Sequence, residues 1–132
     1  MKQCDLRPAA DSSLPLEQRR CAACEGGIPP LLPEQVDGLL SRLGGGWEVT
    51  AGHRLQRELR FADFAEALAF ANQVGALAER EGHHPELLVA WGLVRVTLWT
   101  HAVADLTEND FVLAAKIGKL SEASQRSDSI CG

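Results

Sequence analysis

The sequence predicts an α+β domain in which a four-stranded antiparallel sheet carries three helices packed on one face. Apolar residues recur at helical spacing in three segments of the chain. Between these segments, apolar and polar residues alternate in runs that come as two consecutive pairs, which is typical of antiparallel hairpins. The chain has 132 residues, which is enough for one such domain with a modest core.

The first helix is expected over residues 33–43. Pro33 suits the first helical turn because its missing N–H needs no partner there, and Gly44 is a typical terminator. The apolar residues between them form one stripe: Val36, Leu39, Leu40 and Leu43. The glycines at 44–46 lack the lysine and hydroxyl residue of a phosphate-binding loop, so we interpret them as a flexible link.

Two strands are expected next, over residues 47–50 and 53–61, joined by a turn at Ala51 and Gly52. In the longer strand, apolar and polar residues alternate, which is typical of a strand with one buried face. The apolar face carries Leu55, Leu59 and Phe61, and the polar face carries Arg54, Gln56, Glu58 and Arg60.

A long helix is expected over residues 63–81, where Asp63 and Glu66 form a capping-box pattern and Gly82 follows the last helical residue. Its apolar surface is wide and has two stripes: Phe64, Leu68 and Ala71 on one side, and Ala67, Phe70, Val74 and Leu77 on the other. One sheet covers only part of this circumference, so we expect the chain to form a homo-oligomer through the remaining stripe.

The second pair of strands is expected over residues 86–91 and 94–101. In the later strand, one face carries Val94, Val96, Leu98 and Thr100, and the other carries Arg95, Thr97, Trp99 and His101. Thr107 then caps a last helix that is expected to end at Leu120, with Asp110 at the third helical position. Capping alone explains Asp110, and a direct chemical role is the alternative.

Composition excludes several classes of protein. The formal net charge is −5 and no basic cluster is present, which argues against a nucleic-acid partner. No apolar run reaches the length of about 18 residues that a membrane span needs, and the N-terminus lacks a secretory signal. We therefore expect a cytoplasmic protein, with a domain over residues 28–120 between flexible tails at 1–27 and 121–132.

The four cysteines are expected to be reduced thiols: Cys4, Cys21, Cys24 and Cys131. The spacing of Cys21 and Cys24 matches half of a zinc signature or a redox pair. No second Cys-x-x-Cys or histidine pair lies nearby, and the motif lies in the predicted tail. Neither a zinc nor a redox role is therefore favoured.

Three histidines carry the strongest chemical signal. His83 and His84 fall in the turn before the third strand, and Pro85 stiffens that turn. His101 ends the fourth strand, so pairing of these two strands would bring it toward His83 or His84. Because histidine titrates near neutral pH, neighbouring imidazoles suit proton transfer in both directions.

Other interpretations of the histidines stay open. Histidines are common on polar surface turns, and a histidine pair alone does not define a site. A metal site is disfavoured, because zinc takes several ligands at known spacings and no His-Glu-x-x-His motif is present. Glu79, one helical turn before His83, is placed to orient an imidazole ring.

One spacing connects these residues: Glu79, His83-His84-Pro85, Trp91, His101 and Asp110. This pattern resembles the signature of the pterin-4a-carbinolamine dehydratase family. The resemblance runs over about residues 33–120 and includes the strand RVTLWTH and the helix start LTENDF. The N-terminal tail with its two neighbouring cysteines is similar to that of bacterial members that accompany phenylalanine hydroxylase.

The resemblance implies a homodimer or homotetramer, with a functional link to phenylalanine hydroxylase. It implies three catalytic residues, His83, His84 and His101, and five that bind the substrate: Glu79, Pro85, Trp91, Thr100 and Asp110. Leu87 departs from the family pattern, because many members carry an aromatic residue there.

The implied activity is that of a lyase. It dehydrates 4a-hydroxytetrahydrobiopterin to quinonoid dihydrobiopterin by histidine general acid/base catalysis, in tetrahydrobiopterin recycling. We expect neither a metal nor another cofactor. The alternative is a non-catalytic family member that acts as a partner-binding or assembly module. Loss of the histidines would mark such a relative, and this chain has kept all three.

Overall fold

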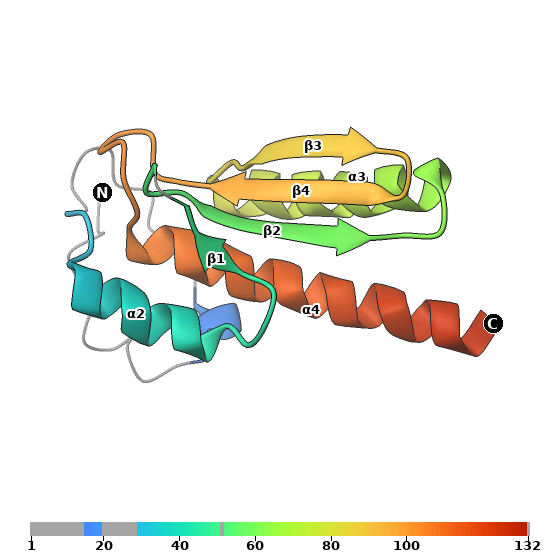
Figure 1. The fold of residues 1–132 in the computed structure, drawn as a ribbon, viewed down its shortest axis with the longest axis horizontal. Helices are drawn as coiled ribbons and strands as arrows, with labels where there is room; N and C mark the ends of the chain where they lie inside the picture. The colour runs from blue at the N-terminus through green and yellow to red at the C-terminus, as the bar shows by residue number, and fades with distance from the viewer. Residues whose placement is uncertain (1–14, 20–28, 51, 132) are drawn as a thin grey trace.

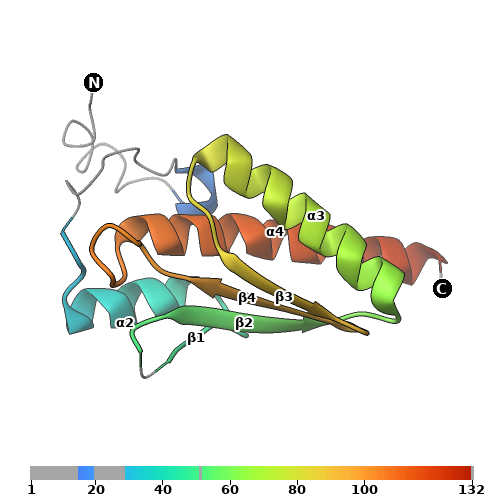
Figure 2. The same ribbon diagram turned by 90° about the horizontal axis from the view of Figure 1, so that it is seen from above.

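The computed structural model describes residues 15–19, 29–50 and 52–131. In chain order, the elements are η1 (Leu16–Gln18), α2 (Pro33–Arg42), β1 (Glu48–Val49), β2 (Leu55–Arg60), α3 (Phe64–Glu81), β3 (Glu86–Ala90), β4 (Leu93–Leu98) and α4 (Glu108–Cys131). The strands form one antiparallel sheet in the order β1-β2-β4-β3 (Figure 1). The helices lie to one side of it, and Figure 2 shows α3 and α4 along the same face. The predicted α+β class is confirmed.

The core lies between the sheet and helices α3 and α4. The apolar faces predicted for the two long strands are buried except at their ends, where Phe61 and Thr100 are partly exposed. The stripe of α3 that was predicted to be apolar is also buried: Ala67, Phe70, Val74 and Leu77. On the other stripe, Phe64 is 44% exposed and Leu68 43% exposed. Ala71, predicted on this stripe, is only 6% exposed, so it belongs to the chain's own packing. The leftover apolar surface of α3 therefore centres on Phe64 and Leu68.

The ends of α3 follow the predicted local chemistry. Asp63 Oδ1 accepts a hydrogen bond from the Glu66 backbone N–H at 2.9 Å, and Glu66 Oε1 accepts one from the Ala62 N–H at 3.1 Å. The first bond is an N-cap, which satisfies a backbone donor that the first turn leaves unpaired. The second bond holds the N–H of the residue before the cap instead of that of Asp63, so the predicted capping box forms only in part. Gly82 follows the last residue with a φ of 69°, as expected for a glycine that ends a helix.

Within the described residues, part of each predicted tail belongs to an ordered element. Helix α4 continues past the expected end at Leu120 to Cys131, because no glycine or proline interrupts residues 121–131. At the other end, Leu16 is buried in the core, and Arg19 forms an ion pair of 2.8 Å with Glu108 at the start of α4. Residues 15–19 therefore pack against the domain.

Some sequence-based expectations concern residues whose side chains or backbone are not described. Cys4, Cys21 and Cys24 lie outside the described residues, as does Ala51 of the predicted turn. The turn itself joins β1 to β2, and the Thr50 N–H donates to the Arg54 carbonyl at 2.7 Å. Within the described ranges, no helix combines the length and the apolar character needed to cross a bilayer.

Arg57 lies on the same face of β2 as Leu55 and Leu59, so period-2 alternation places a charged side chain among the apolar residues of that face. Its guanidinium carbon is 5.9 Å from the centroid of the Trp47 ring. Burial lowers the pKa of Arg57, and the carboxylate of Glu122 opposes this by raising it. The aliphatic part of the side chain can pack against apolar neighbours while the charge stays near Glu122.

The link after α2 passes close to the Arg57 side chain at Gly46. Gly46 has a φ of 97°, and a Cβ added there would lie 2.8 Å from Arg57 Nε. We expect Gly46→Ala to lower the free energy of unfolding by about 1–2 kcal/mol, because it adds both backbone strain and a steric contact. Gly45→Ala is the matched control, since an added Cβ there meets no atom within 4 Å. Urea unfolding measures both variants, and equal losses would contradict this explanation.

Candidate active site

The C-terminal turn of α3 sets the position of two histidines. The N–H groups of Gly82 and His83 both donate to the Ala78 carbonyl oxygen, at 2.9 and 3.3 Å. The left-handed glycine turns the chain away from the helix axis. His83 follows at once, and His84 and Pro85 complete the link to β3.

The most buried polar cluster of the site surrounds Asp110, which is 0% exposed. Its Oδ1 lies 2.6 Å from His83 Nε2. Its Oδ2 accepts hydrogen bonds from the Thr100 hydroxyl at 3.0 Å and from the Thr107 backbone N–H at 2.9 Å. The hydroxyl groups of Thr100 and Thr107 are 2.8 Å apart. Asp110 thus caps α4 with one oxygen, as predicted, and contacts His83 with the other.

The pairing with Asp110 fixes one tautomer of His83. A carboxylate accepts hydrogen bonds but donates none, so Nε2 of His83 carries the hydrogen in this contact. The Nδ1 atom is then the ring position left to take or give a proton. A carboxylate that orients an imidazole in this way is a recurrent arrangement in acid–base sites.

His84 forms a second, exposed pair. Its Nε2 lies 2.6 Å from Glu79 Oε2, with side chains that are 57% and 77% exposed. The sequence placed Glu79 near an imidazole, and the structure assigns it to His84. An exposed pair of this kind contributes at most about 1 kcal/mol to stability, since water screens both charges. The main effect of this pair is therefore to orient the imidazole of His84.

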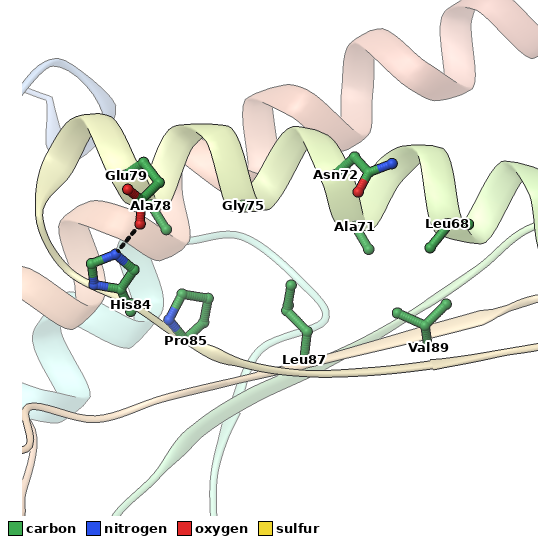
Figure 3. A pocket seen from close by; sticks show the side chains of 10 residues that line it. All are labelled: Leu68, Ala71, Asn72, Gly75, Ala78, Glu79, His84, Pro85, Leu87 and Val89. Carbon is green, nitrogen blue, oxygen red and sulfur yellow. Dashed lines mark hydrogen bonds and ion pairs between the residues drawn. The ribbon is translucent and has the colours of Figure 1, made fainter.

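A groove of about 590 Å³ opens beside this pair, between α3 and β3 (Figure 3). Glu79, His84 and Pro85 lie at one end of it, and the rest of its lining is mainly apolar. Leu87, the position that departs from the family pattern, also points into the groove. The groove thus combines apolar walls with an imidazole–carboxylate pair at its end, which is typical of small-molecule sites.

His101 lies just after β4, at the end of the sheet where β3 begins. The antiparallel register pairs Glu86 with Thr97, so the residues that precede β3 and those that follow β4 lie at the same end. The ring of His101 is exposed and contacts the Trp99 ring, with 4.6 Å between the centroids. Among the described residues, the His101 side chain is in contact with this ring and is not hydrogen-bonded to His83 or His84.

Trp91 lies at the opposite end of the hairpin. It occupies the turn between β3 and β4, next to Gly92 with its φ of 72°, and is 73% exposed. The five residues of β3 separate it from the histidine turn. At a rise of about 3.4 Å per residue, that distance is about 17 Å. Within one chain, the structure therefore does not bring Trp91 to the histidines.

Two contributions to the site were not predicted. The Thr107 hydroxyl, expected only as a helix cap, also contacts Thr100. Trp99, seen in the sequence only as a residue on the same face as His101, contacts its ring. The sequence contained a signal for the second contact, because period-2 alternation places Trp99 and His101 on the same face of the strand. In the described part of the chain, no group of three or more His, Cys, Asp or Glu side chains is arranged to hold a metal ion.

Sequence comparisons show which proteins this chain resembles. A family model described as pterin 4 alpha carbinolamine dehydratase matches residues 29–120. A protein of Rickettsia canadensis is 47% identical over 102 residues, which cover 77% of this chain and 94% of that protein. A protein of Rubrobacter xylanophilus is 47% identical over 105 residues, which cover 80% of this chain and 97% of that protein. Both are provisionally named pterin-4-alpha-carbinolamine dehydratases.

Two solved structures are similar to the fold. A transcriptional coactivator/pterin dehydratase from Brucella melitensis superposes with a TM-score of 0.66 and 33% identity, covering 70% of this chain and 99% of that one. A pterin dehydratase-like protein identified as a RuBisCO assembly factor in the α-carboxysome gives a TM-score of 0.52 and 25% identity. That match covers 59% of this chain and 92% of the other.

The contribution of the Asp110 cluster to the stability of the fold can be measured. We expect Asp110→Ala to lower the free energy of unfolding by about 2–4 kcal/mol, because it leaves several buried donors unpaired. Glu66→Ala is the matched control, since Glu66 holds the same helical position in α3 but is a more exposed cap. Its loss is expected to stay below about 1 kcal/mol. Denaturant unfolding followed by circular dichroism measures both, and similar losses would show that Asp110 acts only as a cap.

Proposed function

Because the chain belongs to the pterin-4a-carbinolamine dehydratase family, we propose that it is a lyase that dehydrates 4a-hydroxytetrahydrobiopterin to quinonoid dihydrobiopterin. The observation that carries this proposal is the pairing of His83 with the buried Asp110, at the end of the sheet that also carries His84 and His101. Such a set of oriented imidazoles suits a reaction that needs both an acid and a base.

The proposed reaction begins with proton donation from an imidazolium to the hydroxyl group on carbon 4a. The carbon–oxygen bond breaks, water leaves, and the lone pair of the neighbouring ring nitrogen forms a carbon–nitrogen double bond. A second imidazole then removes a proton from the ring, which gives quinonoid dihydropterin. One proton is donated and one is removed, so the sum is loss of one water. The cation is delocalised over the pterin, so the chemistry needs no metal or other cofactor.

The residues divide into two roles in this proposal. His83 and His101 form the acid–base pair, and each positioned acid or base contributes roughly 10²–10⁴ in rate. His84, oriented by Glu79, binds and polarises the pterin ring. Pro85 and Thr100 are further proposed binding residues, as is Trp91, which only another copy of the chain could bring to these histidines. Asp110 acts through His83 by fixing its tautomer.

The cellular setting is part of the same proposal. We place the reaction in cytoplasmic tetrahydrobiopterin recycling, where phenylalanine hydroxylase supplies the carbinolamine. Among the similar structures are proteins whose names include a coactivator and an assembly factor. No feature of this chain favours such a role over catalysis, because His83, His84 and His101 are all present.

The acid–base assignment is tested by single substitutions. We expect His83→Ala and His101→Ala each to lower kcat of carbinolamine dehydration by at least about 100-fold while the fold survives. His84→Ala is expected to raise KM more than it lowers kcat, since it removes a binding contact. Stopped-flow absorbance of carbinolamine decay gives the rates, and circular dichroism checks the fold. Wild-type kcat in a folded His83→Ala or His101→Ala protein would refute the assignment.

We also propose a homodimer or homotetramer that covers the exposed apolar stripe of α3. Soluble monomers seldom keep a large apolar patch in water. Leu68 is the better position for a test than Ala71, because Ala71 is packed within the chain. We expect Leu68→Arg to weaken assembly, whereas Gln73→Arg, at an exposed position on the same helix, leaves it intact. Sedimentation at micromolar concentration decides this, and a wild-type monomer of 14.3 kDa would rule out the assembly.

A further inference from the structure

The catalytic role proposed for His101 raises a structural question, because its ring is exposed and lies in a loop. Within the described residues, no hydrogen bond holds the imidazole, so only contacts of its ring can limit its rotation. The loop backbone is well fixed: the Thr100 N–H donates to the Asp105 carbonyl at 2.9 Å, and the Ala104 N–H donates to the His101 carbonyl at 3.3 Å. These bonds place the Cα of His101 but leave the side-chain torsions free.

The ring of Trp99 supplies the missing contact. Its centroid lies 4.6 Å from that of His101, with an angle of 34° between the ring planes. Trp99 is itself partly buried against the core, so it is a firm surface for the imidazole. Ring pairs at this separation attract each other beyond simple burial.

Arg54 contacts the same indole ring. Its guanidinium carbon lies 4.1 Å from the Trp99 centroid, a distance at which a cation is attracted by the face of the ring. Nη1 of Arg54 also donates to the Gly52 carbonyl oxygen at 2.8 Å, which fixes the guanidinium within the turn between β1 and β2. Arg54 thus lies over Trp99 in a prearranged position, and Trp99 in turn contacts His101.

A second contact joins the same turn to the far end of the His101 loop. His53 Nδ1 lies 3.1 Å from Asp105 Oδ1, which also accepts the Leu106 backbone N–H at 2.7 Å. His53 has a φ of 60°, in the left-handed region that is costly for a residue with a side chain. The turn therefore touches both ends of the segment that carries His101: Arg54 before it, through Trp99, and His53 after it.

We propose that Arg54 is a positioning residue for His101 and that it acts through the ring of Trp99. The inference rests on the proposed dehydratase function for its kinetic consequence, but the ring contact itself can be measured without any substrate. Arg54 holds the indole, the indole limits the rotation of the imidazole, and the imidazole stays where proton transfer needs it. The side chain of Arg54 takes no part in the reaction itself.

The kinetic test is a double-mutant cycle. We expect Arg54→Gln to lower kcat roughly two- to fivefold, which matches the strength of an exposed cation–ring contact, with a smaller change in KM. Arg54→Lys keeps a cation and is expected to recover part of the loss. In a Trp99→Leu background, Arg54→Gln is expected to cause no further loss. A full Arg54→Gln effect in that background would overturn the proposal, because Arg54 would then act without the indole.

The matched control is Arg95→Gln. Arg95 projects from the same face of the sheet but is ion-paired with Glu58 at 2.8 Å, whereas it is Arg54 that lies over the Trp99 ring. We expect this variant to keep the wild-type kcat. Trp99→Phe accompanies Trp99→Leu in case the smaller side chain unfolds the protein, and it is expected to keep most of the rate. A loss in Arg95→Gln equal to that in Arg54→Gln would count against the proposal.

A second readout separates this inference from the proposed function. The imidazole Hε1 resonance of His101, assigned with His101→Gln, reports the ring current of Trp99 in the absence of substrate. Arg54→Gln is expected to shift it toward its position in Trp99→Leu, and Arg95→Gln is expected to leave it unchanged. An unmoved resonance in Arg54→Gln overturns the positioning role. If wild-type protein lacks dehydratase turnover, the proposed function is wrong. The resonance still shows whether Arg54 holds Trp99 against His101, because it is measured without substrate.

Discussion

A carboxylate that water does not reach organises this molecule. Burying an unpaired charge costs several kcal/mol, so Asp110 is tolerated only because both of its oxygens are occupied. Its partners come from the turn after α3, the end of β4 and the start of α4. The cap of the last helix, the end of the sheet and the orientation of His83 must therefore form together. The same contacts that stabilise the fold therefore fix the position of the His83 side chain.

The antiparallel hairpin of β3 and β4 distributes the remaining groups. Its register places the segment before β3, with His83 and His84, and the segment after β4, with His101, at the same end of the sheet. The same geometry sends the turn of the hairpin, with Trp91, to the opposite end. Residues that belong to the same family pattern are therefore not all neighbours in one chain. His83, Thr100 and Asp110 are in contact, whereas Trp91 lies at the other end of the hairpin.

Much of this arrangement was predictable because its signals are local. Asp63 and Gly82 mark the ends of α3, and alternation in the strands gives their buried faces. The contact of Arg54 with Trp99 was not predictable, because it joins the segment before β2 to the segment after β4 and depends on side-chain torsions. Nor did the sequence give the partner of Glu79: helical spacing placed it near an imidazole, but the left-handed turn at Gly82 decided which one. Residues 121–131 lack an apolar stripe, so their helix was missed.

Because residues 15–19 pack against the domain, the folded structure extends beyond the range that the family model matches. The family model begins at residue 29, yet Leu16 fills part of the core and Arg19 neutralises Glu108 beside the first turn of α4. A fragment cut at the family boundary would open an apolar hole and leave an acidic side chain without this partner, two residues from Asp110. A segment that lies upstream of the family match therefore stabilises, in this chain, the start of the helix that carries Asp110.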